Sequence, residues 1–294
     1  MRVKLGDVCE RGTSNLKLLD VSEKNGEFSV FGASGYIGSV DFYQQGYPYV
    51  AVVKDGAGIG RAMLCPGKTS VIGTMQYLLP KDNILPKYLF YVVKYMNLEK
   101  YFTGATIPHI YFKDYKNEEF NFDFWERQVE IVSVLSKCEK VIDLCKQELQ
   151  LLDKLIKARF VELFGDPVSN SYGLPEATLP DLGEFGRGVS KHRPRNDIKL
   201  LGGKYPLIQT GDVANAGLYI TSYSSTYSEL GLKQSKMWDK GTLCITIAAN
   251  IAKTAILEFD ACFPDSVVGF IANERTNNIF VHYWFSFFQA ILES

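Results

Sequence analysis

The residues with the most recognisable chemistry are few and far apart in this sequence. The segment GATIPHI (residues 104–110) brings a glycine, a proline and His109 together, as an active site could. The other histidines, His192 and His282, are isolated, and no cysteines have the CxxC spacing of a zinc or redox site. We therefore expect mostly buried, reduced thiols at Cys9, Cys65, Cys138, Cys145, Cys244 and Cys262.

Three short motifs resemble catalytic signatures but lack the context that the chemistry needs. GKT (67–69) has Ala62 in place of the first glycine of a phosphate loop, and a strand-like stretch follows where a helix is required. GAGIG (56–60) is typical of a hairpin turn rather than a dinucleotide fold. After the Pro-Asp pair at 264–265, Thr276 stands where a nuclease needs lysine. The tetrapeptide of amino-methyltransferases is absent, so we find no self-contained catalytic constellation.

Positive charge is concentrated in one turn-rich stretch, GRGVSKHRPRNDIK (186–199). A cluster of this kind suits contact with phosphate groups, although a solvated charged loop explains it equally well. The net charge of the whole chain is −1, so no global field attracts nucleic acid. Any binding to nucleic acid must then depend on local basic patches or on a partner.

The clearest predicted element is a helix over residues 123–165. Asp123 and Glu126 form a capping-box pattern, and Gly165 with Pro167 predicts the end. About 40 residues without Gly or Pro give roughly 60 Å of helix. Its apolar residues alternate at spacings of four and three, which predicts a coiled-coil seam needing a partner helix. This seam consists of Ile131, Leu135, Cys138, Ile142, Cys145, Leu149, Leu152 and Ile156.

The sequence repeats itself on both sides of this helix. VKLGDVCERGTS (3–14) is similar to ATLPDLGEFGRGVS (177–190), and residues 56–64 align with 248–256 without a gap, placing Arg61 opposite Lys253. Farther on, YLFYVV (88–93) matches YWFSFF (283–288). Three matches in the same order indicate an internal repeat.

Each copy alternates short β-branched and aromatic segments with turn residues, which predicts a β-rich domain with some helix. We therefore predict an α+β fold in which two similar β-rich domains are joined by a long coiled-coil-type helix. The predicted boundaries are a first domain at 1–122, the helix at 123–165, a polar linker at 166–176 and a second domain at 177–294. The start of the chain lacks the apolar core of a signal peptide, and no apolar run is long enough to span a membrane, so we expect a cytoplasmic protein.

This arrangement resembles the specificity subunit of type I restriction-modification systems, the HsdS family. The resemblance covers nearly the whole chain and is carried by KLGD (4–7), GATIPHI, the FWERQVEI start of the helix and ELFGDP at its exit. Glu126, Gln128 and Ile131 roughly match the usual start of the family helix, whereas Trp125 and Arg127 depart from it. The resemblance implies that GATIPHI closes the first target-recognition domain, and that His109 is packed or hydrogen-bonded rather than catalytic.

The resemblance also implies a function without catalysis in this chain. The two domains would each read one half of a bipartite double-stranded DNA sequence, and the helix would set the distance between the halves. No cofactor would be bound here: S-adenosylmethionine would be used by methyltransferase (M) subunits, and ATP and Mg by a restriction (R) subunit. We expect DNA contacts from basic and polar residues in turns, namely Ser34, Tyr36, Lys54, Arg61, Arg187, Lys191, Arg193, Arg195 and Lys253.

The second copy looks C-terminally incomplete, because Ser294 aligns near residue 99 of the first copy. The predicted seam would then pair with a second copy of the chain or with another half-length specificity subunit. Two alternatives remain at this point. The chain could be a two-domain coiled-coil scaffold without a DNA role, or the silent product of a truncated specificity gene.

Overall fold

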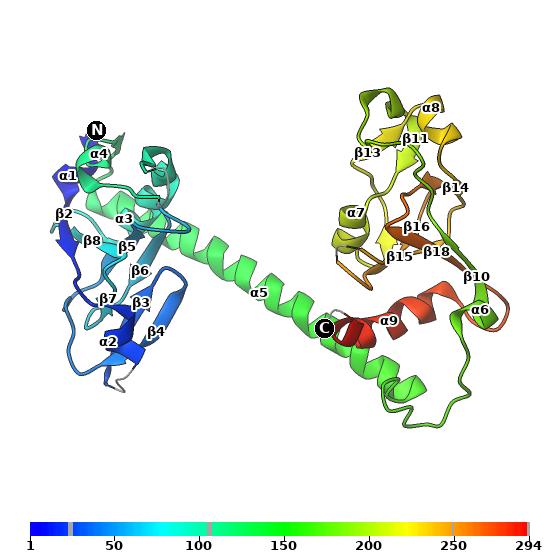
Figure 1. Cartoon of the computed structure of the whole chain (residues 1–294). Coiled ribbons are helices and arrows are strands. Elements are labelled where there is room, and N and C mark those ends of the chain that lie inside the picture. The colour runs from blue at the N-terminus through cyan, green and yellow to red at the C-terminus, as the bar shows by residue number, and fades with distance from the viewer. Residues whose placement is uncertain (23–25, 105–107, 249, 293–294) are drawn as a thin grey trace. The chain divides into compact units, whose positions relative to one another are not determined.

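The computed structural model describes residues 1–22, 26–104, 108–248 and 250–292 (Figure 1). Contacts divide the chain into two compact units, Met1–Lys146 and Gln147–Ser294. The long helix α5 (Trp125–Phe164) contributes its first half to one unit and its second half to the other. The predicted α+β class, with two β-rich units and a long helix, is confirmed.

The first unit is built on two small sheets and a two-stranded ribbon. The four-stranded sheet has the order β2 (Cys9–Thr13), β8 (Met75–Pro80), β5 (Tyr49–Val53) and β6 (Ala62–Cys65). The three-stranded sheet has the order β4 (Gly35–Val40), β3 (Phe28–Gly32) and β7 (Ser70–Val71), and β1 (Arg2–Lys4) pairs with β9 (Glu119–Asn121). The helices are α1 (Leu5–Val8), α2 (Leu18–Ser22), α3 (Pro86–Met96), a 3-10 turn η1 (Leu98–Tyr101) and α4 (Phe112–Tyr115).

The core of the first unit lies between the four-stranded sheet and α3. Strand β5 is buried at every position, as its uninterrupted apolar sequence YVAVV requires. Helix α3 begins at Pro86, where a missing N–H costs nothing, and ends at Asn97 in the left-handed conformation (φ 49°). Leu89 and Val93 of α3 are fully buried in the same core cluster as residues of the sheet.

The second unit has the same plan with additional strands. Its larger sheet has the order β10 (Gly183–Arg187), β18 (Val267–Ala272), β15 (Leu243–Thr246), β16 (Thr254–Leu257) and β12 (Tyr219–Ile220). Its smaller sheet has the order β13 (Ser225–Tyr227), β11 (Leu201–Leu207), β17 (Ala261–Cys262) and β14 (Met237–Trp238). The helices are α6 (Leu179–Leu182), a 3-10 turn η2 (Ile198–Leu200), α7 (Thr210–Asn215), α8 (Glu229–Lys233) and α9 (Asn278–Leu292).

Strand pairing and hydrogen bonds confirm the internal repeat. The order β2-β8-β5-β6 in the first unit corresponds to β10-β18-β15-β16 in the second, with every pair antiparallel. At the entry to both units an aspartate carboxylate accepts the N–H three residues earlier, Lys4 to Asp7 (3.1 Å) and Thr178 to Asp181 (2.9 Å). These matched bonds show that LGD and LPD start the same supersecondary unit.

The third sequence match is wrong in its register. The turn entering α3 has a bond from Ile84 N–H to the Lys81 carbonyl, and the turn entering α9 has the same bond from Thr276 to Asn273. This pairing makes Leu89 the counterpart of Val281, both buried, whereas the sequence match is shifted by about one helical turn. Aromatic residues are frequent along both helices, so their composition matches in several registers, and only core packing selects the true one.

Helix α5 ends as predicted, because Gly165 takes the left-handed conformation (φ 79°) and its N–H bonds to the Val161 carbonyl. It begins at Trp125, two residues after the predicted N-cap Asp123, whose carboxylate accepts the Tyr88 hydroxyl (2.7 Å). Of the predicted seam, Ile131 is half-buried against the first core, while the other members are exposed, Leu149 to 64%. All six cysteines are free, four buried and two, Cys138 and Cys145, exposed on the seam.

Gln128 fixes the start of α5 to the first unit, and its removal tests this attachment. Its fully buried amide accepts the Leu85 N–H (2.9 Å) and donates to the carbonyls of Asn83 (3.0 Å) and Asp123 (2.9 Å). We expect Gln128→Ala to lower the free energy of unfolding by about 2–4 kcal/mol, since buried backbone groups lose their partners. Urea unfolding measures this, with exposed Gln147→Ala as the control; equal midpoints for the two variants contradict the assignment.

His282 makes the stability of the second unit depend on pH. Its Nδ1 lies 2.9 Å from the Thr254 hydroxyl, and burial lowers the pKa of the imidazole below its ordinary value. The unfolded chain therefore binds a proton at a higher pH than the folded chain. The neutral imidazole makes its full contribution to stability above about pH 6.5, and the free energy of unfolding decreases as the pH falls below that value. We expect thermal melts to show a decrease from pH 7.5 to 5.5 that is smaller in His282→Gln; an unchanged pH profile in the variant contradicts this.

Candidate DNA interface

The segment that contains His109 is anchored to a neighbouring hairpin. His109 Nδ1 lies 2.6 Å from Asp55 Oδ1, and Asp55 Oδ2 lies 3.4 Å from Lys54 Nζ. The Gly56 N–H donates to the Pro108 carbonyl (3.0 Å), and Thr103 and His109 exchange two backbone hydrogen bonds. Residues 105–107 of GATIPHI lie outside the described residues. The histidine is thus hydrogen-bonded, as expected, and among the described residues no group of metal-ligating side chains gathers around it.

Arg61 and Lys253 occupy the same position in two corresponding hairpins. Each donates its backbone N–H to the residue three positions earlier, Gly58 (3.2 Å) or Asn250 (3.3 Å). Each also accepts from the last residue of the preceding strand, Val53 (3.0 Å) or Thr246 (2.9 Å). The sequence alignment of these two basic residues is therefore confirmed by backbone geometry.

Left-handed residues shape both hairpins. Gly58 and Gly60 have positive φ in the first, and Asn250 and Ala252 have φ values of 55° and 61° in the second. The resulting turn allows the Arg61 guanidinium to donate to the Gly58 carbonyl through Nε (3.2 Å). The guanidinium also donates to the Ala57 carbonyl through Nη2 (3.4 Å). These two contacts hold the exposed group on the turn, and the N–H bonds of its Nη1 atom remain available to an anion.

Ser34 and Tyr36 lie on a different sheet from Lys54 and Arg61. Ser34 is in the turn between β3 and β4, and Tyr36 is in β4 with its ring exposed. Tyr36 makes an edge contact with Phe31, with ring centroids 6.4 Å apart. The described contacts therefore do not join Ser34 or Tyr36 to Lys54 or Arg61.

In the second unit, three of the expected residues converge on Asp265. The Arg187 guanidinium donates to the backbone carbonyl of Asp265. The Asp265 carboxylate lies 3.4 Å from Arg193 Nη2 and 2.5 Å from Arg195 Nη2. Arg193 also donates to the carbonyls of Ser190 (2.6 Å) and His192 (2.9 Å). We call Arg187, Arg193, Arg195 and Asp265 the arginine cluster. Three guanidiniums and one carboxylate leave it with net positive charge on an exposed surface.

Lys191 and Lys253 are not part of this cluster in the described contacts. Lys191 is exposed and its backbone N–H donates to the Gln234 carbonyl (3.4 Å). Lys253 belongs to the β15–β16 hairpin. The five expected basic residues of this unit therefore divide into a cluster of three and two separate positions.

The sequence interpretation missed Asp265 in the arginine cluster, and it missed a second contact in the same unit, which Lys236 makes. Asp265 organises the arginines, although the sequence offered it only as a rejected nuclease carboxylate. Lys236 lies over the Trp238 ring at 3.7 Å from its centroid, and Trp238 stacks on Phe263. A Lys-x-Trp pair in a β-rich stretch is a weak signal of such a cation–π contact.

A comparison with known protein families identifies the family to which these two units belong. A family model for the type I restriction modification DNA specificity domain matches residues 1–154 and 176–294. The chain belongs to this family.

Two curated specificity proteins of Methanocaldococcus jannaschii are similar to this family member. The type I restriction enzyme MjaIX specificity subunit is 26% identical over 54% of this chain and 40% of its own length. The putative type I restriction enzyme MjaX specificity subunit is 22% identical over 80% of this chain and 59% of its own. The chain thus spans about 40% to 59% of the curated relatives it matches.

A solved structure shows the same fold in the specificity family. The crystal structure of the type I restriction-modification system S subunit from M. genitalium matches all of this chain and 78% of its own, with a TM-score of 0.63 and 16% identity. The repeat of β-rich units is therefore a folding pattern shared with a known S subunit. Separately, none of the helices within the described ranges is long and apolar enough to cross a membrane.

Proposed function

We propose that this chain supplies DNA sequence specificity to a type I restriction-modification complex by recognising a bipartite double-stranded target. The observation that carries this proposal is the repeat: two units of the same topology present Arg61 and Lys253 at the same hairpin position. Two equivalent readers in one chain suit two half-sites, and α5 is a rigid element that can set their spacing. Membership of the specificity family supports this reading.

The chain acts without catalysing a reaction in this proposal. It positions M subunits that methylate adenine with S-adenosylmethionine and an R subunit that uses ATP and Mg. The arginine cluster and the two hairpins supply local positive charge, which a chain of net charge −1 needs in order to approach phosphates. Side chains at these turns would contact the backbone or the base edges of the major groove.

The seam of α5 pairs with a second long helix in the assembled complex. Seven of its eight apolar members are exposed, and a narrow apolar stripe of this length is stable in water only against another helix. Another specificity subunit, such as a second copy of the chain, can supply that helix. The helix pair would then hold the recognition units of both contributors.

Methylation sequencing tests the proposal directly. The chain is co-expressed with its neighbouring methyltransferase in cells that lack other adenine methylation, and methylated positions are mapped. We expect a bipartite adenine-methylated motif. A palindromic motif would indicate two copies reading identical half-sites through their first units, and an asymmetric motif would indicate that both units of one chain read DNA.

The control is the same methyltransferase beside a specificity subunit of known activity. If that pair methylates DNA and the chain does not, the specificity role fails. DNA binding by the purified chain then separates the remaining explanations. A chain that binds neither DNA nor the methyltransferase is the coiled-coil scaffold of the alternative interpretation.

A further inference from the structure

The two copies of the repeat differ in one connecting segment. In each unit it joins the edge strand of the larger sheet, β2 or β10, to a strand of the smaller sheet, β3 or β11. These smaller-sheet strands correspond, because β3 pairs in parallel with β7 and β11 pairs in parallel with β17. The segment comprises residues 14–27 in the first unit and residues 188–200 in the second, so the two can be compared directly.

The two segments have net charges of opposite sign. Residues 14–27 include two lysines and three acidic residues, whereas residues 188–200 include two lysines, two arginines and a single aspartate. Features that two readers share serve the fold, and features in which they differ are suited to reading different DNA sequences. Residues 188–200 are therefore a candidate for base recognition and not only for phosphate contact.

The acidic residue that holds the arginines is also specific to the second unit. The Met75 N–H donates to the Ile72 carbonyl (2.9 Å), and the Val267 N–H donates to the Pro264 carbonyl (2.9 Å). These matched bonds make Gly73 the counterpart of Asp265. The first unit thus has no carboxylate at the position from which Asp265 contacts Arg193 and Arg195.

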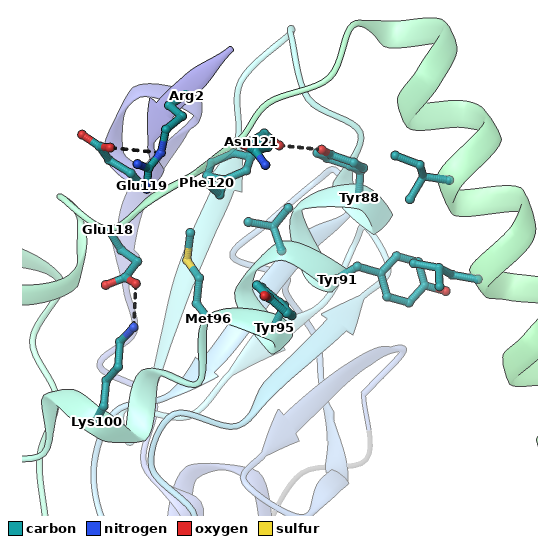
Figure 2. Close-up of a pocket in the computed structure, with 13 residues that line it drawn as sticks. Arg2, Tyr88, Tyr91, Tyr95, Met96, Lys100, Glu118, Glu119, Phe120 and Asn121 are labelled. Carbon is teal, nitrogen blue, oxygen red and sulfur yellow. Dashed lines mark hydrogen bonds and ion pairs between the residues drawn. The ribbon is translucent and has the colours of Figure 1, made fainter.

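The open groove of the first unit has no comparable excess of positive charge (Figure 2). It has a volume of about 1010 Å³ and lies beside α3. Arg2, which lines it, lies 3.4 Å from Glu119, and Lys100 lies 2.5 Å from Glu118. Each of these two positive charges has its own carboxylate, so the groove does not attract a phosphate backbone.

Residues 188–200 are held in place at both ends. Near the start, the Gln234 side-chain oxygen accepts the His192 N–H (3.0 Å). At the end, Leu200 is buried in the core and its carbonyl accepts the Ser228 N–H (2.8 Å). The segment is thus fixed to the second unit by contacts on either side of its most exposed part.

Asp197 fixes the conformation of the 3-10 turn η2 within this segment. One carboxylate oxygen accepts the Lys199 N–H (3.0 Å), and the other lies 3.1 Å from His192 Nε2. The Asp197 backbone N–H donates to the Pro194 carbonyl (3.2 Å). The residue that follows Asp197 is therefore presented on a turn that is already ordered before any partner binds.

That residue is Ile198, and its side chain is 88% exposed. No other isoleucine, leucine or valine in the described parts of the chain is as exposed, and the next, Leu19, reaches 74%. A single exposed aliphatic residue is common on protein surfaces. Here, however, it lies at the tip of a fixed turn, three residues after Arg195 and next to Lys199.

We propose that Ile198 reads a thymine by contacting its 5-methyl group in the major groove. Thymine is the base that presents a methyl group there, and an aliphatic side chain is its matching partner. The basic residues of residues 188–200 would hold the flanking phosphates and set the depth of the turn in the groove. The proposal rests on the DNA-specificity function and names one base that the second unit recognises.

The fixed turn is essential to this reading. Burying one methyl group changes affinity by only about fourfold, at about 0.8 kcal/mol for one buried carbon. Ordering several residues of a flexible loop would cost more than this contact contributes. Because Asp197, Gln234 and Leu200 order the segment in the free protein, a contact of this size can discriminate between bases.

A thymine-to-uracil scan tests the proposal, because uracil differs from thymine only in lacking the methyl group. The purified complex of the chain with its methyltransferase first selects its preferred duplexes from a random pool. Each thymine of the selected motif is then replaced by uracil, one at a time, and anisotropy titrations measure affinity. We expect about fourfold weaker binding at one position, and no loss at that position in the Ile198→Ala variant.

Leu19→Ala is the matched control, because Leu19 is a highly exposed aliphatic residue of the first unit. It should keep the full thymine effect at the position that Ile198 reads. A motif in which every thymine-to-uracil change has the same effect with and without Ile198 overturns the proposal. So does an Ile198→Ala variant that only weakens assembly with the methyltransferase, since Ile198 then contacts protein.

The proposal and the DNA-specificity function have distinguishable failures. If the complex selects no sequence from the pool, the specificity function fails and the thymine contact fails with it. If it selects a bipartite motif whose thymine effects are all independent of Ile198, only the thymine contact fails.

Discussion

Replacing Arg187, Arg193 and Arg195 together by alanine is expected to weaken DNA binding by about 100- to 1000-fold. Each guanidinium in the arginine cluster is an exposed, fixed donor, and a charge-assisted contact contributes about 1.5 kcal/mol or more, roughly a tenfold change in affinity. The loss of about three phosphate contacts should also reduce the slope of log K against log salt by about 2.7. Anisotropy titrations with duplex DNA at several salt concentrations measure both quantities.

The control for this variant has the same charge change elsewhere in the second unit. Lys204, Lys233 and Lys240 are exposed and lie outside the arginine cluster, so their triple alanine variant lowers the net charge equally. We expect only a small effect from it. If the two triple variants have the same affinity and salt slope, the cluster is a solvated charged surface and not a phosphate-binding site. Circular dichroism confirms that both variants are folded.

Single substitutions separate phosphate contacts from base contacts. A lysine or arginine that contacts phosphate should weaken all sequences alike, whereas one that reads a base should relax specificity at one position of the target. Arg61 and Lys253 occupy equivalent hairpin positions, so their alanine variants should affect different half-sites of a bipartite target. An identical effect of both variants on the same half-site contradicts the division of labour between the units.

Local patterns in the sequence predicted the features that depend on interactions between residues close together in the chain. The helix of α5 follows from a long stretch without Gly or Pro and a stop at Gly165, and the Arg61–Lys253 correspondence follows from turn residues that align without a gap. The correspondence of Asp7 with Asp181 also follows from the local sequence, because a capping box involves only four consecutive residues.

Features that depend on tertiary packing were not predictable in this way. The correspondence of α3 with α9 required the burial of Leu89 and Val281, because an aromatic-rich helix matches another in several registers. The arginine cluster required Asp265, which is far from the arginines in sequence and meets them only through the pairing of β10 with β18. Ser34 and Tyr36 were grouped with Arg61 by residue type, but strand order places them on another sheet.

The second large effect is expected from Ile142→Asp in the seam. Ile142 is an exposed apolar residue near the middle of α5, and pairing with another helix would bury it among apolar neighbours. An unpaired carboxylate there costs several kcal/mol, so we expect helix pairing to weaken at least 100-fold. Sedimentation equilibrium measures this for the chain alone and for the chain mixed with a peptide of residues 125–164.

Gln147→Asp is the matched control, since it introduces the same charge on the face of α5 that points away from the seam. It should pair normally. The exposed thiols of Cys138 and Cys145 provide an independent readout, because mild oxidation should cross-link the seam to a cysteine-bearing partner helix only when the pair forms. Seam pairing is contradicted if the chain stays monomeric at tens of micromolar and does not bind the helix peptide. The exposed apolar stripe must then be covered by a partner of another kind.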